Sequence, residues 1–155
     1  MKTALFPGSF DPFTIGHQAL VDEGLKVFDR IVIAIGDNSD KKGLLPIERR
    51  KALIEELYKD KSGVEVVVYD GLTGDYCRHH NLRFILRGMR NTVDFDYERN
   101  MMQINERIFP EITTVLLFTP PELAAVSSSI IREILSYGGR VDDFMPEGID
   151  INRYL

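Results

Sequence analysis

The stretch that joins the first apolar segment to the first amphipathic one, Phe6-Pro-Gly-Ser-Phe-Asp-Pro-Phe-Thr-Ile-Gly-His17, has the composition of a phosphate-binding loop. Pro7 and Pro12 fix φ and lack a backbone N–H, so the stretch resists both helix and strand, while its glycines let the backbone approach a ligand closely. His17 begins a helix, whose first turn offers unpaired N–H groups and the positive end of the helix dipole. The imidazole adds a donor toward the same anion, so we predict a phosphate site here.

Other hydroxyl and cationic side chains follow later apolar segments. They are Lys41, Thr73, Arg87, Arg90 and the run Ser127-Ser-Ser129. Ser9 lacks the G-x-S-x-G context of a nucleophilic serine, and the chain has neither G-x-x-x-x-G-K-[ST] nor G-x-G-x-x-G, which disfavours hydrolases, P-loop kinases and dinucleotide oxidoreductases. The remaining chemistry is attack of an anionic phosphate oxygen on the phosphorus of a nucleotide, which needs alignment and charge neutralisation rather than a strong base.

Apolar periodicity predicts strands and helices that alternate along the chain. Short, continuous apolar runs predict strands at Thr3–Phe6, Arg30–Gly36, Val64–Tyr69, Arg83–Arg87 and Thr113–Phe118. Apolar residues at helical spacing predict helices over His17–Phe28, after Pro46, within Gly71–His80 with Thr73 as its cap, over Asp94–Ile108, and from Ser127 to Gly138. The C-terminal residues predict a short helical tail.

This alternation indicates an α/β fold: a Rossmann-like, doubly wound five-stranded parallel sheet with helices on both faces. Such a sheet binds ligands at the carboxyl ends of its strands, near the point where strand order reverses. The hydroxyl and cationic residues named above each follow one of the five predicted strands. We therefore expect them to line one site.

The composition is that of a globular domain. Because the chain has 155 residues, 44% of them hydrophobic and 28% charged, we expect residues 1–155 to form a single domain. The net charge of −5 argues against general nucleic-acid binding. No apolar run approaches the ~20 residues of a membrane helix, so we expect a cytoplasmic protein without a membrane partner. The single Cys77 excludes an intrachain disulfide and is expected to pack in the core.

Five sequence blocks, in order, resemble those of one enzyme family. Pro7-Gly-Ser-Phe-Asp-Pro12 followed by Thr14-Ile-Gly-His17 is similar to the signature of the nucleotidyltransferases that carry a T/H-x-G-H motif. Among these enzymes, the chain resembles the bacterial phosphopantetheine adenylyltransferases. The further blocks that carry this resemblance are Lys41-Lys42, Arg87-Gly-Met-Arg90, Asp94-Phe-Asp-Tyr-Glu98 and Val126-Ser-Ser-Ser129 with Arg132.

The resemblance implies a reversible step of coenzyme A biosynthesis. ATP and 4′-phosphopantetheine would give dephospho-coenzyme A and pyrophosphate, without a covalent intermediate and with Mg²⁺ carried by the phosphates of ATP. It also implies a homohexamer and feedback inhibition by coenzyme A. No protein side chain is assigned as a metal ligand, since Mg²⁺ usually binds to phosphates and waters.

The resemblance also assigns roles to individual residues. His17, Lys41 and Arg90 would be catalytic, with His17 stabilising charge on the transferred α-phosphoryl group and Lys41 orienting the attacking phosphate. Contacts to the acceptor would come from Ser9, Lys41, Thr73 and Arg87. Contacts to ATP would come from Ser9, Phe10, His17, Gly88, Met89, Arg90, Glu98, Leu123, Ala124, Ala125, Val126, Ser127, Ser128 and Ser129.

Two other functions stay open from the residues alone. One is another adenylyl- or cytidylyltransferase of the same fold, acting on a mononucleotide or a small alcohol phosphate; Lys41 and the pair Arg87 and Arg90 argue against it, because they suit a dianionic phosphate. The other is a non-catalytic nucleotide-binding module, which would not need His17 and Lys41. The charge of His17 in the complex with nucleotide also stays open, because a helix start lowers its pKa whereas a triphosphate raises it.

Overall fold

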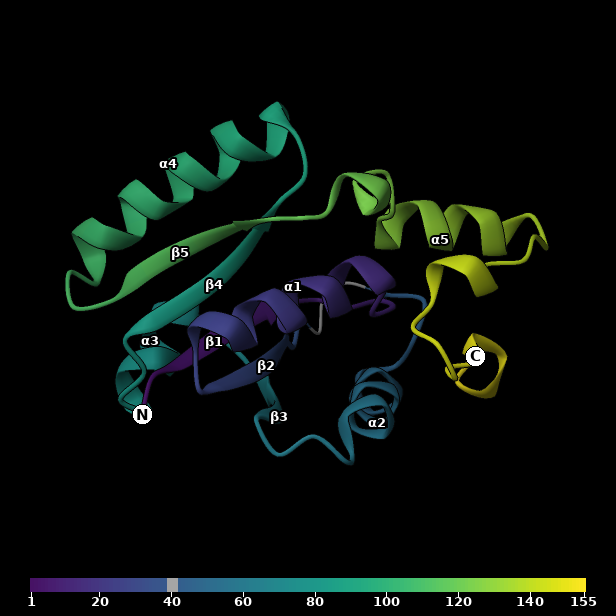
Figure 1. Cartoon of the computed structure of the whole chain (residues 1–155), viewed down its shortest axis with the longest axis horizontal. Helices are drawn as coiled ribbons and strands as arrows, with labels where there is room; N and C mark the ends of the chain where they lie inside the picture. Colours follow the sequence, from purple (N-terminus) through teal and green to yellow (C-terminus); the bar gives the residue numbers. More distant parts are fainter. Residues whose placement is uncertain (39–41) are drawn as a thin grey trace.

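The computed structural model, which describes residues 1–38 and 42–155, confirms the predicted α/β class. Its strands form one parallel five-stranded sheet in the order β3-β2-β1-β4-β5. The strands are β1 (Thr3–Gly8), β2 (Arg30–Gly36), β3 (Val64–Tyr69), β4 (Phe84–Met89) and β5 (Thr113–Phe118). The helices are α1 (Ile15–Val27), α2 (Ile47–Tyr58), α3 (Thr73–His79), α4 (Thr92–Ile108) and α5 (Ser128–Ser136). Short 3-10 turns are η1 (Pro121–Leu123), η2 (Asp142–Phe144) and η3 (Ile151–Arg153), and the last two form the C-terminal tail (Figure 1).

Helices cover both faces of the sheet, as the sequence predicts. Side chains of β1 alternate between two apolar clusters: Ala4 and Phe6 belong to one and Leu5 to the other. The larger cluster is closed by apolar residues of α1, α2, α5 and the C-terminal tail, and α1 lies in front of the strands in Figure 1. The smaller cluster is closed by Cys77 of α3, which is fully buried as predicted, and by Phe109 just after α4.

The point where strand order reverses lies beside β1. The chain adds β2 and β3 on one side of β1 and then crosses over to add β4 and β5 on the other side. The ladder between β1 and β2 continues to the pair Gly8↔Ile35, whereas the ladder between β1 and β4 ends at Leu5↔Ile85. β1 and β4 therefore separate toward their carboxyl ends, which is where a sheet of this kind leaves room for a ligand.

The prediction that Pro7 and Gly8 resist strand formation is wrong. Both residues belong to β1 and pair with Ala34 and Ile35 of β2. Proline is tolerated at this level because β1 has already left β4, so the missing N–H interrupts no ladder on that side. The carbonyl oxygen of Pro7 instead accepts a hydrogen bond from Arg87 Nη1 at 3.2 Å.

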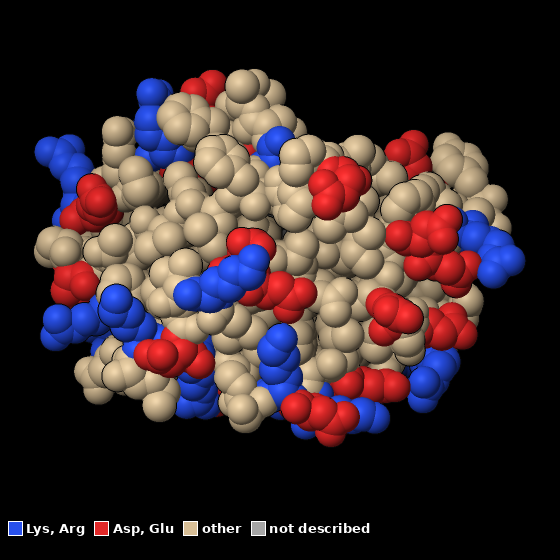
Figure 2. Space-filling model, viewed as in Figure 1, with Lys and Arg blue, Asp and Glu red and all other residues tan. Residues whose placement is uncertain are grey.

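The surface carries charges of both signs. On the face drawn in Figure 2, basic and acidic side chains are interspersed, in keeping with the modest net charge of −5. Such a surface lacks the single-sign field that marks general nucleic-acid binding on this face. Among the described residues, no helix combines the length and the low charge that crossing a bilayer requires.

Tyr58, at the end of α2, buries a polar group that has no partner within the described part of the chain. Its side chain is 7% exposed, and its ring packs edge-on against Phe13 with ring centroids 6.0 Å apart. The hydroxyl makes no hydrogen bond there. Burial, together with the charge of Asp22, raises the pKa of this phenol above its ordinary value. A buried hydroxyl without a partner lowers stability relative to an apolar group of the same shape.

We expect Tyr58→Phe to leave the free energy of unfolding unchanged or to raise it by up to about 1 kcal/mol, because only the unpaired oxygen is removed. Urea unfolding of the two proteins measures the difference. Tyr154→Phe is the matched control: this hydroxyl donates to Glu56, so its loss is expected to lower stability. A clear loss of stability from Tyr58→Phe would mean that its hydroxyl is hydrogen-bonded in solution.

Candidate active site

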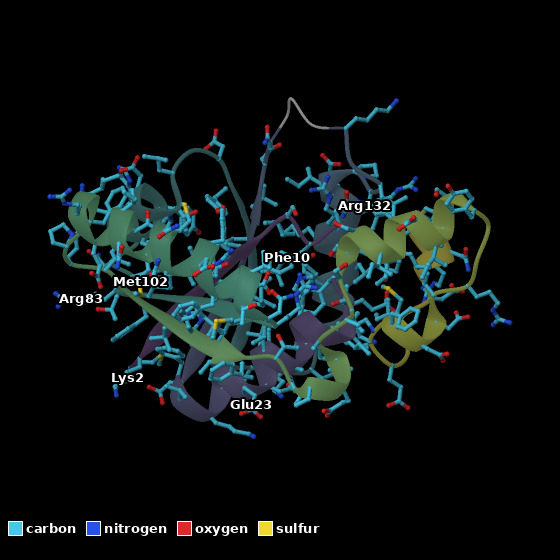
Figure 3. All side chains as sticks on the ribbon, turned by 90° about the horizontal axis from the view of Figure 1, so that it is seen from above. Lys2, Phe10, Glu23, Arg83, Met102 and Arg132 are labelled. Carbon is cyan, nitrogen blue, oxygen red and sulfur yellow. The ribbon has the colours of Figure 1, made fainter. Side chains whose placement is uncertain are left out.

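A cavity of about 450 Å³ opens at the carboxyl ends of β1 and β4, where the two strands separate. Its lining includes Ser9, Phe10, His17, Arg87, Gly88, Arg90, Val126, Ser127, Ser128, Ser129, Thr119 and Arg132. Figure 3 shows Phe10 near the middle of the molecule and Arg132 to its right, whereas Lys2 and Arg83, which precede β1 and β4, lie on the left, at the other end of the strands. The cavity is thus on the edge of the sheet where a doubly wound fold binds its ligands.

His17 is held in one orientation by the start of α1. The helix begins at Ile15 and not at His17, with Thr14 as its cap. The Thr14 hydroxyl accepts from the backbone N–H of Gly16 at 3.1 Å and of His17 at 3.3 Å. In return, His17 Nδ1 accepts the backbone N–H of Thr14 at 3.0 Å, which completes a capping box. Because Nδ1 is an acceptor, the proton of a neutral imidazole lies on Nε2, the nitrogen left to act as a donor.

Three aromatic rings surround the imidazole of His17. The ring centroids of Phe6, Phe10 and Phe13 lie 6.2, 5.0 and 5.2 Å from that of His17. Burial among these rings, with the nearby positive charges of Arg90 and Arg87, lowers the pKa of His17 to about 4. The free protein therefore carries His17 as a neutral Nε2–H donor near neutral pH.

We expect the protein to lose stability as the pH falls from 6.5 toward about 4, in part through His17. Over this range the unfolded chain binds a proton on His17 that the folded protein does not, so the folded state loses up to about 3 kcal/mol relative to pH 7. His17→Gln removes this titration and keeps an acceptor at the capping position. Urea unfolding of both proteins at pH 7 and at pH 4 measures the difference. An equal loss in both proteins would mean that His17 titrates normally in the folded state.

Arg87 links the main cavity to a second, smaller one of about 190 Å³, which it lines together with Thr73, Glu98 and Met102. Arg87 Nε lies 3.0 Å from Glu98 Oε2, and Arg87 Nη2 lies 2.6 Å from Oε1. Burial alone would lower the pKa of this guanidinium, but the hydrogen bonds and charge of Glu98 raise it. Arg87 is therefore a fixed cation whose position is set by Glu98.

Thr73 does not cap α3, contrary to the prediction. It is the first residue of the helix, whose cap residue is Leu72, and no side chain caps this end. The Thr73 hydroxyl instead lies 2.8 Å from the hydroxyl of Tyr69, at the end of β3. This hydrogen bond keeps Thr73 on the wall of the second cavity.

The far wall of the main cavity is built to hold an anion. Ser127, where the sequence predicts that a helix begins, caps α5 by accepting the backbone N–H of Ile130 at 3.2 Å. Arg90 Nη1 donates to the carbonyl oxygen of Val126 at 3.3 Å, and Arg132 Nη1 donates to that of Asp11 at 2.8 Å. These bonds place two cations and the N-terminus of α5 at the wall of the main cavity. Phosphate groups bind to such an arrangement.

Comparison with known proteins identifies the family. A sequence profile of the cytidylyltransferase-like family matches residues 5–134, which extend from β1 into α5. The phosphopantetheine adenylyltransferase of Bacteroides thetaiotaomicron is 47% identical over 98% of this chain and 100% of its own length. Its namesake from Clostridium botulinum is 40% identical over 96% of this chain and 94% of its own length. The chain belongs to the phosphopantetheine adenylyltransferase family.

A solved structure agrees with this assignment at the level of the fold. A bifunctional NMN adenylyltransferase/ADP ribose pyrophosphatase from Francisella tularensis aligns with a TM-score of 0.72 at 18% identity, over 93% of this chain and 44% of that one. As a member of the phosphopantetheine adenylyltransferase family, the chain is a nucleotidyltransferase.

The structure brings most, but not all, of the predicted family residues to the main cavity. Thr73 and Glu98 line the second cavity and not the main one. Met89, the last residue of β4, and the turn Leu123 to Ala125 are not among the residues that line the main cavity. Lys41 lies outside the described residues.

Three residues that shape the active site of this phosphopantetheine adenylyltransferase are not predicted from the sequence. Thr14 positions the His17 ring, and the T-x-x-H spacing, which matches a capping box, was the signal for it. Thr119, which directly follows β5, lines the cavity. Its position immediately after a predicted strand is the sequence signal that could have identified it. Asp11 is 5% exposed, and its carboxylate accepts hydrogen bonds from a segment that is distant in the sequence. No local sequence pattern indicates such a contact.

Proposed function

We propose that the chain transfers the AMP group of ATP to 4′-phosphopantetheine, giving dephospho-coenzyme A and pyrophosphate in a reversible step of coenzyme A biosynthesis. The name shared by relatives 40–47% identical over nearly their whole length supports this acceptor. The observation that carries the reaction class is the single cavity that His17 lines together with Arg87, Arg90 and Arg132. Such a set of fixed donors and cations stabilises charge on phosphoryl oxygens.

The proposed reaction needs no base from the protein. An anionic oxygen of the acceptor phosphate attacks the α-phosphorus of ATP and forms a new P–O bond. The bond from the α-phosphorus to the oxygen that bridges to the β-phosphate breaks, and pyrophosphate leaves with that electron pair. No covalent intermediate with the protein forms. The protein contributes alignment and neutralisation of the charge that develops on the α-phosphoryl oxygens.

Each catalytic residue then has a physical role. His17 donates its Nε2–H to the α-phosphoryl oxygen as negative charge grows there, an interaction supported by the Thr14 N–H that occupies Nδ1. Arg90 neutralises the phosphates of ATP from the end of β4, and Lys41 orients the attacking phosphate. Because these groups act on charge that is largest in the transition state, they contribute more to turnover than to binding.

The two cavities suggest how the substrates divide between them. ATP would occupy the main cavity, with its phosphates near Ser9, Ser127 and the start of α5, where unpaired N–H groups and the helix dipole favour an anion. The acceptor would extend into the second cavity, whose wall combines Thr73 with the apolar side chains of Met101 and Met102. Arg87 lines both cavities and would contact the acceptor phosphate between them.

Mg²⁺ is proposed to arrive with ATP. The described residues contain no group of three His, Cys, Asp or Glu side chains placed to hold a metal ion. A cavity lined by arginines suits a Mg²⁺ ion that is bound mainly by phosphate oxygens and waters. Once bound with ATP, the ion would neutralise charge on the departing pyrophosphate.

The decisive experiment incubates the protein with ATP, Mg²⁺ and 4′-phosphopantetheine and measures pyrophosphate and dephospho-coenzyme A. We expect both products in equal amounts. Nicotinamide mononucleotide in place of 4′-phosphopantetheine tests the alternative acceptor. Pyrophosphate release only with the mononucleotide would replace the proposed acceptor, and release with neither acceptor would favour a non-catalytic nucleotide-binding module.

We propose that a second copy of the chain covers the outer face of α4, as part of a homohexamer. Val93, Tyr97, Met101, Ile104 and Ile108 recur at helical spacing along it, and each is 40% or more exposed. Tyr97 and Met101 also line the second cavity, so the second copy would border that cavity. An apolar stripe of this kind on a soluble helix indicates a contact surface. Light scattering is expected to give six times the 17.7 kDa mass of one chain, and a monomeric mass would contradict the assembly.

Residues 1–155 would act as one domain, because both cavities are built on a single sheet. Coenzyme A contains the acceptor's phosphopantetheine group, so it would compete for the same site as a feedback inhibitor. A cytoplasmic location remains the expectation that accompanies this activity.

A further inference from the structure

Tyr69 and Thr73 share a hydrogen bond at the wall of the second cavity. Tyr69 is the last residue of β3 and Thr73 the first of α3, and their hydroxyl oxygens lie 2.8 Å apart. Between them, Gly71 adopts a φ of 78°, a conformation that favours glycine and turns the chain sharply. The hydrogen bond closes this turn and fixes the side chain of Thr73, which lines the second cavity, against the end of β3.

The ring of Tyr69 is held in place from its own side. It packs against the smaller apolar cluster, with its centroid 5.4 Å from that of Tyr76 on α3. Its carbonyl oxygen accepts the backbone N–H of Asp37 at 2.7 Å, which ties the end of β3 to the end of β2. Tyr69 is not among the described residues that line the second cavity; it lines a neighbouring cavity of about 430 Å³ together with Ser9. Its hydroxyl therefore meets the second cavity through Thr73.

The pair of hydroxyls leaves one proton for a ligand. A phenol donates a hydrogen bond more readily than an aliphatic alcohol, so Tyr69 donates to Thr73 and the Thr73 hydroxyl keeps its own proton. Within the described part of the chain, that hydroxyl makes no other hydrogen bond. The same wall carries the apolar side chains of Ile85, Met101 and Met102. A ligand that excludes water from this wall leaves the Thr73 donor unpaired unless the ligand itself supplies an acceptor.

We propose that Tyr69 is a positioning residue that sets acceptor specificity: it holds the Thr73 hydroxyl so that Thr73 donates to an amide carbonyl of the acceptor's pantetheine arm. The proposal rests on the function proposed above. Several uncharged polar residues line the described wall, and Thr73 is the one whose side chain is fixed by a hydrogen bond; the others are Tyr97, Asn105 and Thr114. Acceptor phosphates without an amide gain nothing from the Thr73 hydroxyl, so the pair favours 4′-phosphopantetheine over small alkyl phosphates.

Steady-state kinetics of Tyr69→Phe, Thr73→Val and the double variant test this role. Each substitution removes a hydroxyl and keeps most of the side-chain shape. We expect KM for 4′-phosphopantetheine to rise about fivefold in Tyr69→Phe and about tenfold in Thr73→Val, with kcat and the Kd for ATP changed less than about twofold. Because Tyr69 acts through Thr73, the double variant is expected to match Thr73→Val. Losses that multiply would show that Tyr69 contacts the acceptor by itself and would overturn the proposal, as would a lower kcat with KM unchanged.

An acceptor analogue separates specificity from the general shape of the cavity. Neopentyl phosphate keeps the phosphate and the branched hydrocarbon of 4′-phosphopantetheine but has no amide. Its Ki as an inhibitor competing with 4′-phosphopantetheine is expected to stay within about twofold in Tyr69→Phe, in Thr73→Val and in the double variant. Equal weakening of the analogue and of 4′-phosphopantetheine would mean that the hydrogen bond only shapes the cavity, which contradicts the proposal.

Two further variants complete the test. Thr73→Ser keeps the hydroxyl and is expected to hold KM within about twofold, so its contrast with Thr73→Val tests the donor even if Tyr69→Phe does not fold. Tyr76→Phe is the matched control: it removes the hydroxyl of the ring that packs against Tyr69, and Tyr76 is not among the described residues that line the main, second or neighbouring cavity. Its KM is expected to be unchanged.

The same measurements distinguish this proposal from the proposed function. If the unchanged protein does not transfer AMP to 4′-phosphopantetheine, the proposed function itself fails. If it does, and KM is the same in Tyr69→Phe and Thr73→Val as in the unchanged protein, only the role of Tyr69 fails.

Discussion

His17→Ala is expected to lower kcat for AMP transfer by about 10²- to 10³-fold while changing the Kd for ATP by less than about threefold. The reason is the orientation of the ring. Nδ1 is occupied by the Thr14 N–H, which leaves the Nε2–H as the group that can respond to charge on the α-phosphoryl oxygen. Such charge is small in bound ATP and large in the transition state, so the lost donor affects turnover far more than binding.

The control for His17→Ala separates catalysis from folding. Alanine removes the capping acceptor as well as the donor, so the variant is also expected to lose about 1 kcal/mol of stability. His17→Gln returns an acceptor at this position of the capping box, and its stability is expected to approach that of the unchanged protein while kcat stays low. Stopped-flow or steady-state pyrophosphate release gives kcat, and calorimetry gives the Kd for ATP. Comparable losses in kcat and in ATP affinity would make His17 a binding residue.

Glu98→Ala is expected to raise KM for 4′-phosphopantetheine by about tenfold or more and to leave the Kd for ATP within about threefold. Resemblance to the family assigned Glu98 to ATP, whereas the structure pairs it with Arg87 beside the second cavity. Without the carboxylate, Arg87 keeps only its hydrogen bond from Nη1 to the carbonyl oxygen of Pro7, so the rest of its guanidinium is free to reorient. The acceptor phosphate would then meet a mobile cation.

The same substitution is expected to lower stability. Glu98 is 7% exposed and the Arg87 side chain about a third exposed, so removing the carboxylate leaves a partly desolvated cation unpaired, at a loss of about 2 kcal/mol after allowance for screening. Glu111→Ala is the matched control, because it breaks an exposed pair with Arg78 on the protein surface and is expected to change neither KM nor ATP affinity. Weaker ATP binding with an unchanged KM for the acceptor would return Glu98 to the ATP side.

Much of the fold could be predicted because its signals are local. The run Arg30 to Gly36 is continuously apolar and β-branched, which a parallel strand covered on both faces requires, and it forms β2 with the predicted bounds. Serine is a preferred residue type at helix N-caps, and Ser127 caps α5. The prediction is wrong at Pro7, whose missing N–H is typical of a strand breaker: the residue is tolerated because β1 has left β4 at that level, which no local signal shows.

By itself, the sequence determined the alternation of strands and helices, the phosphate-binding loop and the family, since each depends on residue types and spacings within short stretches. Only the tertiary structure decided which side chains meet. Glu98 pairs with Arg87 rather than facing the main cavity, Thr73 bonds to Tyr69 rather than capping its helix, and Asp11 binds backbone more than thirty residues away. These partners are chosen by how the helices pack on the sheet. Periodicity reports which face of an element is buried, but not which polar group on a neighbouring element that face will meet.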